Sequence, residues 1–261
     1  MRTIIKSIFA VSLILLSACT IQEKYWGKVA PVFVNEEAKQ HINSTKVVVS
    51  LDQDKRLGIP VLGQRTSHQY YGVIGKLAES GMVRFENDLS EEQRRLLREV
   101  DKAAFRFDAG IEFRETAENS LRSLAWLKVS SVINQTDLQI PDIERMVQTQ
   151  DEDVLLLIDT RYLMAIDFSS ITVFSYVTMY AHDESLVKIA KDALPYEHPP
   201  TLYKNLFSYE FRYAGSYTTA DDALKGWGKN EGEMVQLAIS ESISDLTKQI
   251  VDDLSFTTLK K

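Results

Sequence analysis

Side chains that could carry acid–base or metal chemistry are few and scattered in this sequence. The four histidines, His41, His68, His182 and His198, lack the close spacing of metal ligands, although His182 and His198 each adjoin an acidic residue. Neither a Gly-x-Ser-x-Gly elbow nor a His-Glu-x-x-His helix occurs. The sequence therefore predicts no catalytic residues, no metal site and no cofactor. A hydrolase stays open as a lesser alternative, which requires His182 or His198 to meet an acid or a serine in a cleft.

Two groups of adjacent carboxylates are the next candidates for chemistry. Asp151-Glu152-Asp153 precedes an apolar run, and Asp221-Asp222 follows Thr218-Thr219. Paired carboxylates act as acid and base only where their environments separate their pKa values. We expect the first group to lie in a solvated loop, and the second to supply the acids that favour the first turn of a helix.

A candidate ligand-binding set combines a charged pair with tyrosines from two alternating segments. Asp159 and Arg161 stand at the exit of a buried strand, where they form either part of a site or a structural ion pair. Tyrosine has an apolar face and a polar tip, which suits a groove for a peptide or a glycan, but cross-strand packing uses the same residues. The set is Tyr176, Tyr180, Tyr209, Asp159 and Arg161.

Nucleotides and nucleic acids are not expected partners. Gly72-Val-Ile-Gly75-Lys76-Leu77 matches only part of a phosphate-binding loop, because Tyr70 stands at the position of the leading glycine and Leu77 at that of the serine or threonine. The chain carries 37 acidic and 30 basic residues. A protein that is acidic overall repels phosphate backbones.

The N-terminus has the order of a secretory signal. Arg2 and Lys6 precede an apolar run from Ile8 to Leu16, and small residues follow it up to Cys19, which is the chain's one cysteine. The run is shorter than the roughly 20 residues that a transmembrane helix needs. A single cysteine forms no internal disulfide, so another use for it is expected.

The sequence Leu16-Ser17-Ala18-Cys19 resembles the lipobox of bacterial lipoproteins. The resemblance implies cleavage after Ala18, lipidation of Cys19, and, because Thr20 is not an aspartate, sorting to the outer membrane with the domain facing the periplasm. Loss of Arg2 and Lys6 leaves 28 basic against 37 acidic residues and moves the net charge from −7 to −9. We divide the chain into a signal peptide (1–18), a lipidated N-terminus and tether (19–45) and one folded domain (46–261).

Along that domain, segments with helical periodicity and segments with strand alternation do not follow one another in strict turn. Strands are expected at 46–51, 129–133, 154–158, 169–180 and 203–213, with the two around Asp167 forming a hairpin. Ser90 and Gln93 have the spacing of a capping box, which predicts a helix interrupted near Gly110. Further helices are expected at about 115–128, after Thr219, and at 231–254, where apolar residues recur every three or four positions.

These patterns predict a single α+β domain, with a mixed or mainly antiparallel sheet packed by helices and a long amphipathic helix at its C-terminus. The order of elements resembles periplasmic lipoprotein domains related to curli-secretion subunits, penicillin-binding-protein activators and the amino-terminal domain of the Tol-system translocation protein. This resemblance implies an assembly, scaffold or regulatory protein that contacts other envelope proteins. A binding module for a small ligand or glycan is the main alternative.

Overall fold

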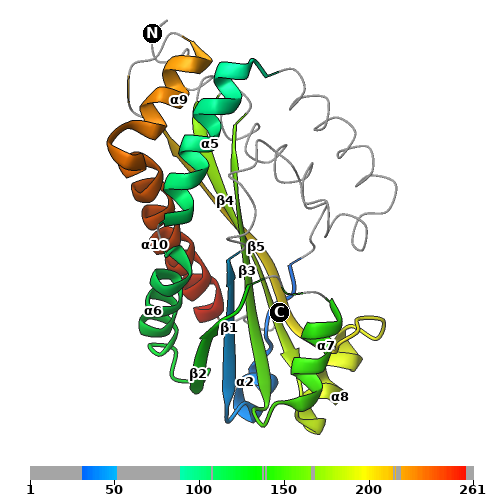
Figure 1. The fold of residues 1–261 in the computed structure, drawn as a ribbon. Coiled ribbons are helices and arrows are strands. Elements are labelled where there is room, and N and C mark those ends of the chain that lie inside the picture. The colour runs from blue at the N-terminus through cyan, green and yellow to red at the C-terminus, as the bar shows by residue number, and fades with distance from the viewer. Residues whose placement is uncertain are drawn as a thin grey trace, which may run out of the picture.

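The computed structural model describes residues 31–51, 89–106, 108–136, 138, 140–165, 168–213, 215 and 219–256. Cys19, the expected signal peptide, His68 and the segment around Gly72 lie outside these ranges. The described chain forms one five-stranded sheet in the order β2-β1-β3-β4-β5 (Figure 1). The strands are β1 (Thr45–Leu51), β2 (Val129–Asn134), β3 (Val154–Met164), β4 (Ser170–Ala181) and β5 (Thr201–Arg212).

The sheet is mixed, as predicted. Strand β1 pairs in parallel with both β2 and β3, whereas β3, β4 and β5 form an antiparallel meander. The predicted hairpin of β3 and β4 is present, and β3 is the central strand. Its residues Val154 to Ile158 are almost fully buried because both faces of the sheet are covered at this strand.

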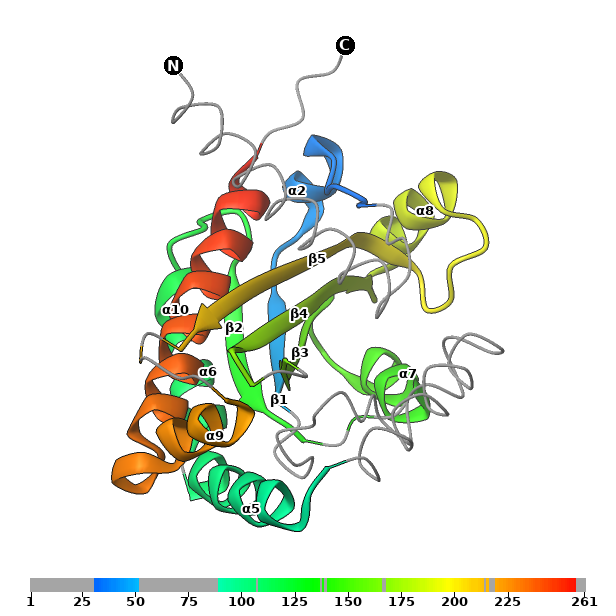
Figure 2. The same ribbon diagram turned by 90° about the horizontal axis from the view of Figure 1, so that it is seen from above.

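Helices cover the two faces unequally (Figure 2). Helices α6 and α10 pack on one face of the sheet, which we call the α10 face, and α5 and α9 pack against α10. Helix α7 packs on β3 at the other face, which we call the α7 face. Helices α2 and α8 pack on each other, and α8 also contacts β4 and β5. Their bounds are α2 (Glu36–His41), α5 (Glu91–Arg106), α6 (Ala109–Leu121), α7 (Ile140–Thr149), α8 (Glu184–Ala193), α9 (Ala220–Gly228), the 3-10 turn η1 (Lys229–Gly232) and α10 (Glu233–Ser255).

The predicted C-terminal helix is confirmed, and its apolar stripe forms much of the core. Six residues of α10 spaced by three or four positions are buried against the sheet. They are Val235, Ile239, Ile243, Leu246, Ile250 and Leu254. Trp227 of α9 extends this core, and its indole N–H donates to the carbonyl of Phe168 at 2.8 Å.

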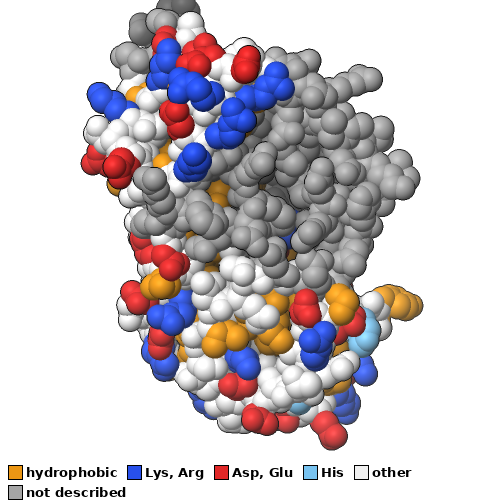
Figure 3. Space-filling view, in the orientation of Figure 1, with side chains coloured by type: hydrophobic (Ala, Val, Ile, Leu, Met, Phe, Trp, Pro, Cys, Tyr) orange, Lys and Arg blue, Asp and Glu red, His pale blue; other side chains and the backbone are white. Residues whose placement is uncertain are grey.

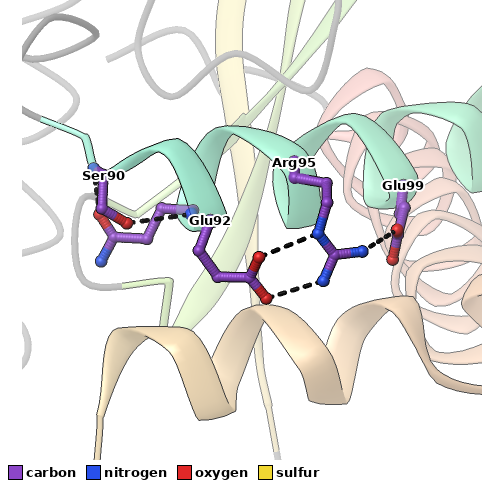
Figure 4. A network of polar contacts seen from close by, with 5 residues as sticks. Ser90, Glu92, Arg95 and Glu99 are labelled. Carbon is purple, nitrogen blue, oxygen red and sulfur yellow. Dashed lines mark hydrogen bonds and ion pairs between the residues drawn. The ribbon is translucent and has the colours of Figure 1, made fainter.

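The predicted capping box begins α5 (Figure 4). The backbone N–H of Gln93 donates to Ser90 Oγ at 3.1 Å, and the backbone N–H of Ser90 donates to Gln93 Oε1 at 3.0 Å. On the exposed side of the same helix Arg95 contacts Glu92 and Glu99 at 2.7 and 2.6 Å. The hydrogen bond from Arg95 lowers the pKa of Glu92.

The helix boundary expected at Gly110 is wrong. Helix α5 ends at Arg106, and α6 begins at Ala109 after the N-cap Asp108, whose side chain accepts from the N–H of Ile111 at 3.1 Å. Gly110 is therefore the second residue of α6, and the helix expected from Glu115 begins at Ala109. An aspartate at the N-cap satisfies a free amide of the first turn, which the glycine side chain cannot do.

The second half of the expected tether packs on the domain. Val32 makes an isolated antiparallel bridge to Lys204 of β5, with N–H to O distances of 2.9 and 3.1 Å. The following residues Val34, Ala38 and Ile42 belong to the main core. Lys39 joins α2 to the end of α10, because its ammonium donates to the carbonyl of Phe256 at 3.2 Å.

Candidate functional site

The predicted pair of Asp159 and Arg161 lies on the α7 face of the sheet. Arg161 Nη2 is 3.0 Å from Asp159 Oδ2, and their side chains are 20% and 23% exposed. Asp159 stands opposite Tyr176 in the β3–β4 register. The pair is therefore partly shielded from water and lies next to one of the candidate tyrosines.

Tyr176 and Tyr180 also lie on the α7 face, but in different surroundings. Tyr180 is buried in a small cluster beneath α7, with Val48, Leu155 and Leu157 among its members. Tyr176 keeps partial exposure, and burial raises its pKa, an effect that the nearby Lys204 opposes. Of these two tyrosines, only Tyr176 has a partly solvent-exposed side chain.

Tyr209 lies on the opposite face. It pairs with Val173, whose side chain belongs to the main core, and burial together with Glu241 and Asp245 of α10 raises the pKa of Tyr209. The structure thus brings together Asp159, Arg161 and Tyr176, places Tyr180 further along the same face, opposite Leu155, and puts Tyr209 on the other face. The five residues do not line one groove.

Each group of carboxylates contains a side chain with a structural hydrogen-bond partner, which is the backbone for Asp153 and the side chain of Gln93 for Asp221. Asp153 Oδ2 accepts from the backbone N–H groups of Asn43 and Ser44 at 2.6 and 3.1 Å, which fixes the start of β1 beside β3. Asp221 accepts from Gln93 Nε2 at 2.9 Å in the first turn of α9, where Thr219 is the N-cap. The helix expected after Thr219 is confirmed, and Asp221 and Asp222 lie in its first turn, as predicted.

The histidines are dispersed over the described residues. Nδ1 of His182 lies 3.2 Å from the carbonyl oxygen of Val147, and His198 is exposed in the connection from α8 to β5. His41 ends α2. Within the described part of the chain, no group of three or more His, Cys, Asp and Glu side chains could hold a metal ion.

A hollow between α2 and α8 was not foreseen from the sequence. It has a volume of about 370 Å³ and is open to solvent on one side. Its charged lining comes from Glu37 and His41 of α2 and from Lys188 and Asp192 of α8. Neither of the two short helices that line this hollow was predicted from the sequence.

The exposed charge on α5 is another feature of the surface. Arg94, Arg98 and Lys102 are exposed and recur every four residues, so they follow one side of the helix. Figure 3 shows Lys and Arg side chains gathered in this upper part of the molecule. The described residues offer these three cations no ion pair, whereas Arg95 is held by Glu92 and Glu99.

The described chain is thus an α+β domain with one mixed sheet. It matches no protein-family model, no curated protein and no solved structure. No helix among the described residues is long and apolar enough to cross a membrane.

Proposed function

We propose that the protein is a lipid-anchored lipoprotein of the outer membrane, facing the periplasm, and that it acts as a non-enzymatic assembly, scaffold or regulatory factor through contacts with other envelope proteins. The observation that carries the proposal is the lipobox-like sequence Leu16-Ser17-Ala18-Cys19 around the chain's one cysteine. Several acyl chains on one residue give effectively stable attachment, since each buried CH₂ contributes about 0.8 kcal/mol.

The arrangement of the folded domain supports a role in protein contacts. The chain joins the domain beside the last turn of α10, where Lys39 reaches Phe256. Helix α5 packs on α9 and on the start of α10. Because α10 has 23 residues, its two ends are about 34 Å apart, and the basic side of α5 lies far from the anchor. There Arg94, Arg98 and Lys102 are available to an acidic partner rather than to the membrane.

Lipidation is tested directly with Cys19→Ala. We expect radiolabelled palmitate to enter the wild-type protein and to be absent from the variant, because the variant has no thiol to acylate. Unchanged labelling of Cys19→Ala would end the lipoprotein proposal. Thr20→Asp probes sorting, and we expect it to move the protein to the inner membrane.

The partner is sought by cross-linking in cells, followed by purification of the wild-type and Cys19→Ala proteins. We expect a near-stoichiometric envelope protein that depends on lipidation. Its recovery should fall when Arg94 and Arg98 are both changed to Glu, since charge reversal repels an acidic surface. As a matched control, Lys188→Glu changes a cation on α8. A partner lost equally in both variants would argue against a contact at α5.

A binding module for a small polar ligand is the second candidate function. The hollow between α2 and α8 supports it, because its volume of about 370 Å³ lies within the range of roughly 300 to 1,000 Å³ that is usual for ligand sites. We expect soluble cell-wall fragments that carry both amino and carboxyl groups to raise the melting temperature of the wild-type protein but not of Lys188→Ala. No rise with wild-type protein would remove this candidate.

A further inference from the structure

Three of the exposed large apolar side chains in the described part of the molecule are aromatic, and each belongs to or adjoins a residue that contacts the start of the described chain or its bridge partner Lys204. Phe33 follows the bridge between Val32 and Lys204, and it is 45% exposed. Phe256 ends α10 and is 71% exposed, while its carbonyl accepts from Lys39 of α2. Tyr196, at 98% exposed, precedes Glu197, which is ion-paired with the same Lys204. We call these three residues the aromatic end.

The aromatic end is built on firmly held backbone. Tyr203, beside the Val32 bridge, donates its hydroxyl proton to Asp253 of α10 at 2.5 Å, and Asn205 donates to the same carboxylate at 3.1 Å. Lys39 is nearly buried and lies over the ring of Trp126, 5.3 Å from its centroid. These contacts tie α2, β5 and the last turn of α10 together. Phe33 and Phe256 are therefore exposed on a rigid support.

We propose that the aromatic end is a membrane-contacting surface, which places Phe33 and Phe256 in the interfacial layer of the bilayer that holds the anchor. This inference rests on the lipidation of Cys19 proposed above. Phe side chains are among those that amphipathic surfaces bury at the boundary of headgroups and acyl chains, where the apolar ring leaves water. Tyr is enriched at membrane interfaces because its ring leaves water while its hydroxyl stays hydrated.

The length of the tether supports a membrane rather than a protein as the occupant of this surface. Val32 is only thirteen residues after Cys19, so even a fully extended chain keeps it within about 45 Å of the acylated residue. The aromatic end is also the end of the domain at which this chain arrives. The exposed Glu36, Glu37 and Asp252 repel anionic headgroups, so the contact depends on the anchor and is lost without it.

Site-specific fluorescence quenching tests this orientation. Since Cys19 is the chain's one cysteine and its thiol is acylated, an introduced cysteine gives a single labelling site. Phe33→Cys and Phe256→Cys report on the aromatic end. Leu237→Cys is the matched control, because Leu237 is 43% exposed on the same helix as Phe256 but nineteen residues earlier, or about 28 Å along the axis.

Each variant is labelled with bimane and reconstituted as the lipidated protein in phosphatidylethanolamine–phosphatidylglycerol vesicles that contain a headgroup nitroxide lipid. We expect the nitroxide to remove most of the fluorescence at positions 33 and 256 and little at position 237. Circular dichroism confirms that each variant is folded. Equal, weak quenching at all three positions would overturn the proposal, as would strong quenching at position 237 alone.

Flotation of the same vesicles separates this inference from the proposed function. Lipidated protein that floats with the vesicles without selective quenching would overturn the orientation and leave the anchor intact. Wild-type protein that does not float, and that shows no lipid by mass spectrometry, would overturn the anchor and the orientation together. The Cys19→Ala protein is expected neither to float nor to be quenched.

Discussion

Acidic side chains in this protein cap helices and fix loops. Asp183 is the N-cap of α8, where its Oδ1 accepts from the backbone N–H groups of Ser185 and Leu186 at 2.9 and 3.4 Å and from the hydroxyl of Ser185. Asp108 does the same for α6, and Asp153 holds two amides before β1. In the two groups of adjacent carboxylates, Asp153 and Asp221 likewise accept hydrogen bonds that join separate segments of the fold.

The cap at Asp183 gives a pH-dependent prediction. Asp183→Ala should lower the free energy of unfolding by about 1 kcal/mol at neutral pH, because the first turn of α8 loses its acceptor. The hydrogen bond from the Ser185 side chain, with the two backbone bonds, lowers the pKa of Asp183 in the folded protein. The carboxylate form is thus favoured by folding, so its contribution is present above about pH 4 and is lost as the pH falls further.

Asp183→Asn is the matched control, since asparagine is also a good N-cap but does not titrate. Urea unfolding from pH 3 to pH 7 should show wild type more stable than Asp183→Asn at pH 7 and the two converging near pH 3. A constant difference between them across this range would contradict the assigned role of the carboxylate.

At the scale of elements, the turn between α9 and α10 determines how α5 packs. Three successive residues, Asn230, Glu231 and Gly232, have positive φ values of 53°, 58° and 82°. At Gly232 the backbone also approaches α5 closely, because an added Cβ would lie 2.0 Å from Cβ of Ala103. Glycine is needed there both for its φ value and for this close approach.

Gly232→Ala should therefore destabilise the protein by about 2 kcal/mol or more, through backbone strain and displacement of α5. Gly228→Ala is the matched control four residues earlier, where φ is −78° and an added Cβ would meet only Val100 Cγ2 at 3.8 Å. We expect that variant to be unchanged or more stable by about 0.5 kcal/mol. Thermal unfolding of both variants provides the comparison, and equal melting temperatures would contradict the close packing of η1 on α5.

At the scale of the whole molecule, the folded unit includes residues that precede β1. Val34, Ala38 and Ile42 are buried in the same core as the stripe of α10. Asn43 and Ser44 donate backbone protons to Asp153 at the start of β3. Residues 32–44 thus connect the start of the described chain to β3, to β5 and to the end of α10, which would fix the orientation of the domain relative to the anchor proposed above.

Truncation tests this connection. A chain that begins at residue 31 should unfold in one cooperative transition, whereas a chain that begins at residue 45 should fail to fold or should aggregate. Burial of one Val or Ile side chain contributes about 1.5 to 3 kcal/mol, and a domain is stable by only about 5 to 15 kcal/mol. Equal melting temperatures for the two chains would show that residues 31–44 contribute little to the fold.

The sequence by itself determined most of the elements and their buried faces. Period-two alternation identified β4 and β5, and spacings of three and four identified the buried stripe of α10, because these periods follow directly from backbone geometry. The capping box at Ser90 is a contact between residues three positions apart, so it was also predictable. Helices α7 and α8 were missed, since helices of ten residues have little stability until they pack on a sheet.

Only the tertiary structure decided which residues meet. Pairing of β1 with both β2 and β3 joins segments about 80 to 110 residues apart, and no local pattern encodes that choice. The register of β3 with β4 brings Asp159 beside Tyr176, while the pairing of β5 turns Tyr209 toward α10 on the other face. Alternation divides the residues of a single strand between two faces. Only the pairing of strands determines which residues of neighbouring strands lie on the same face of the sheet.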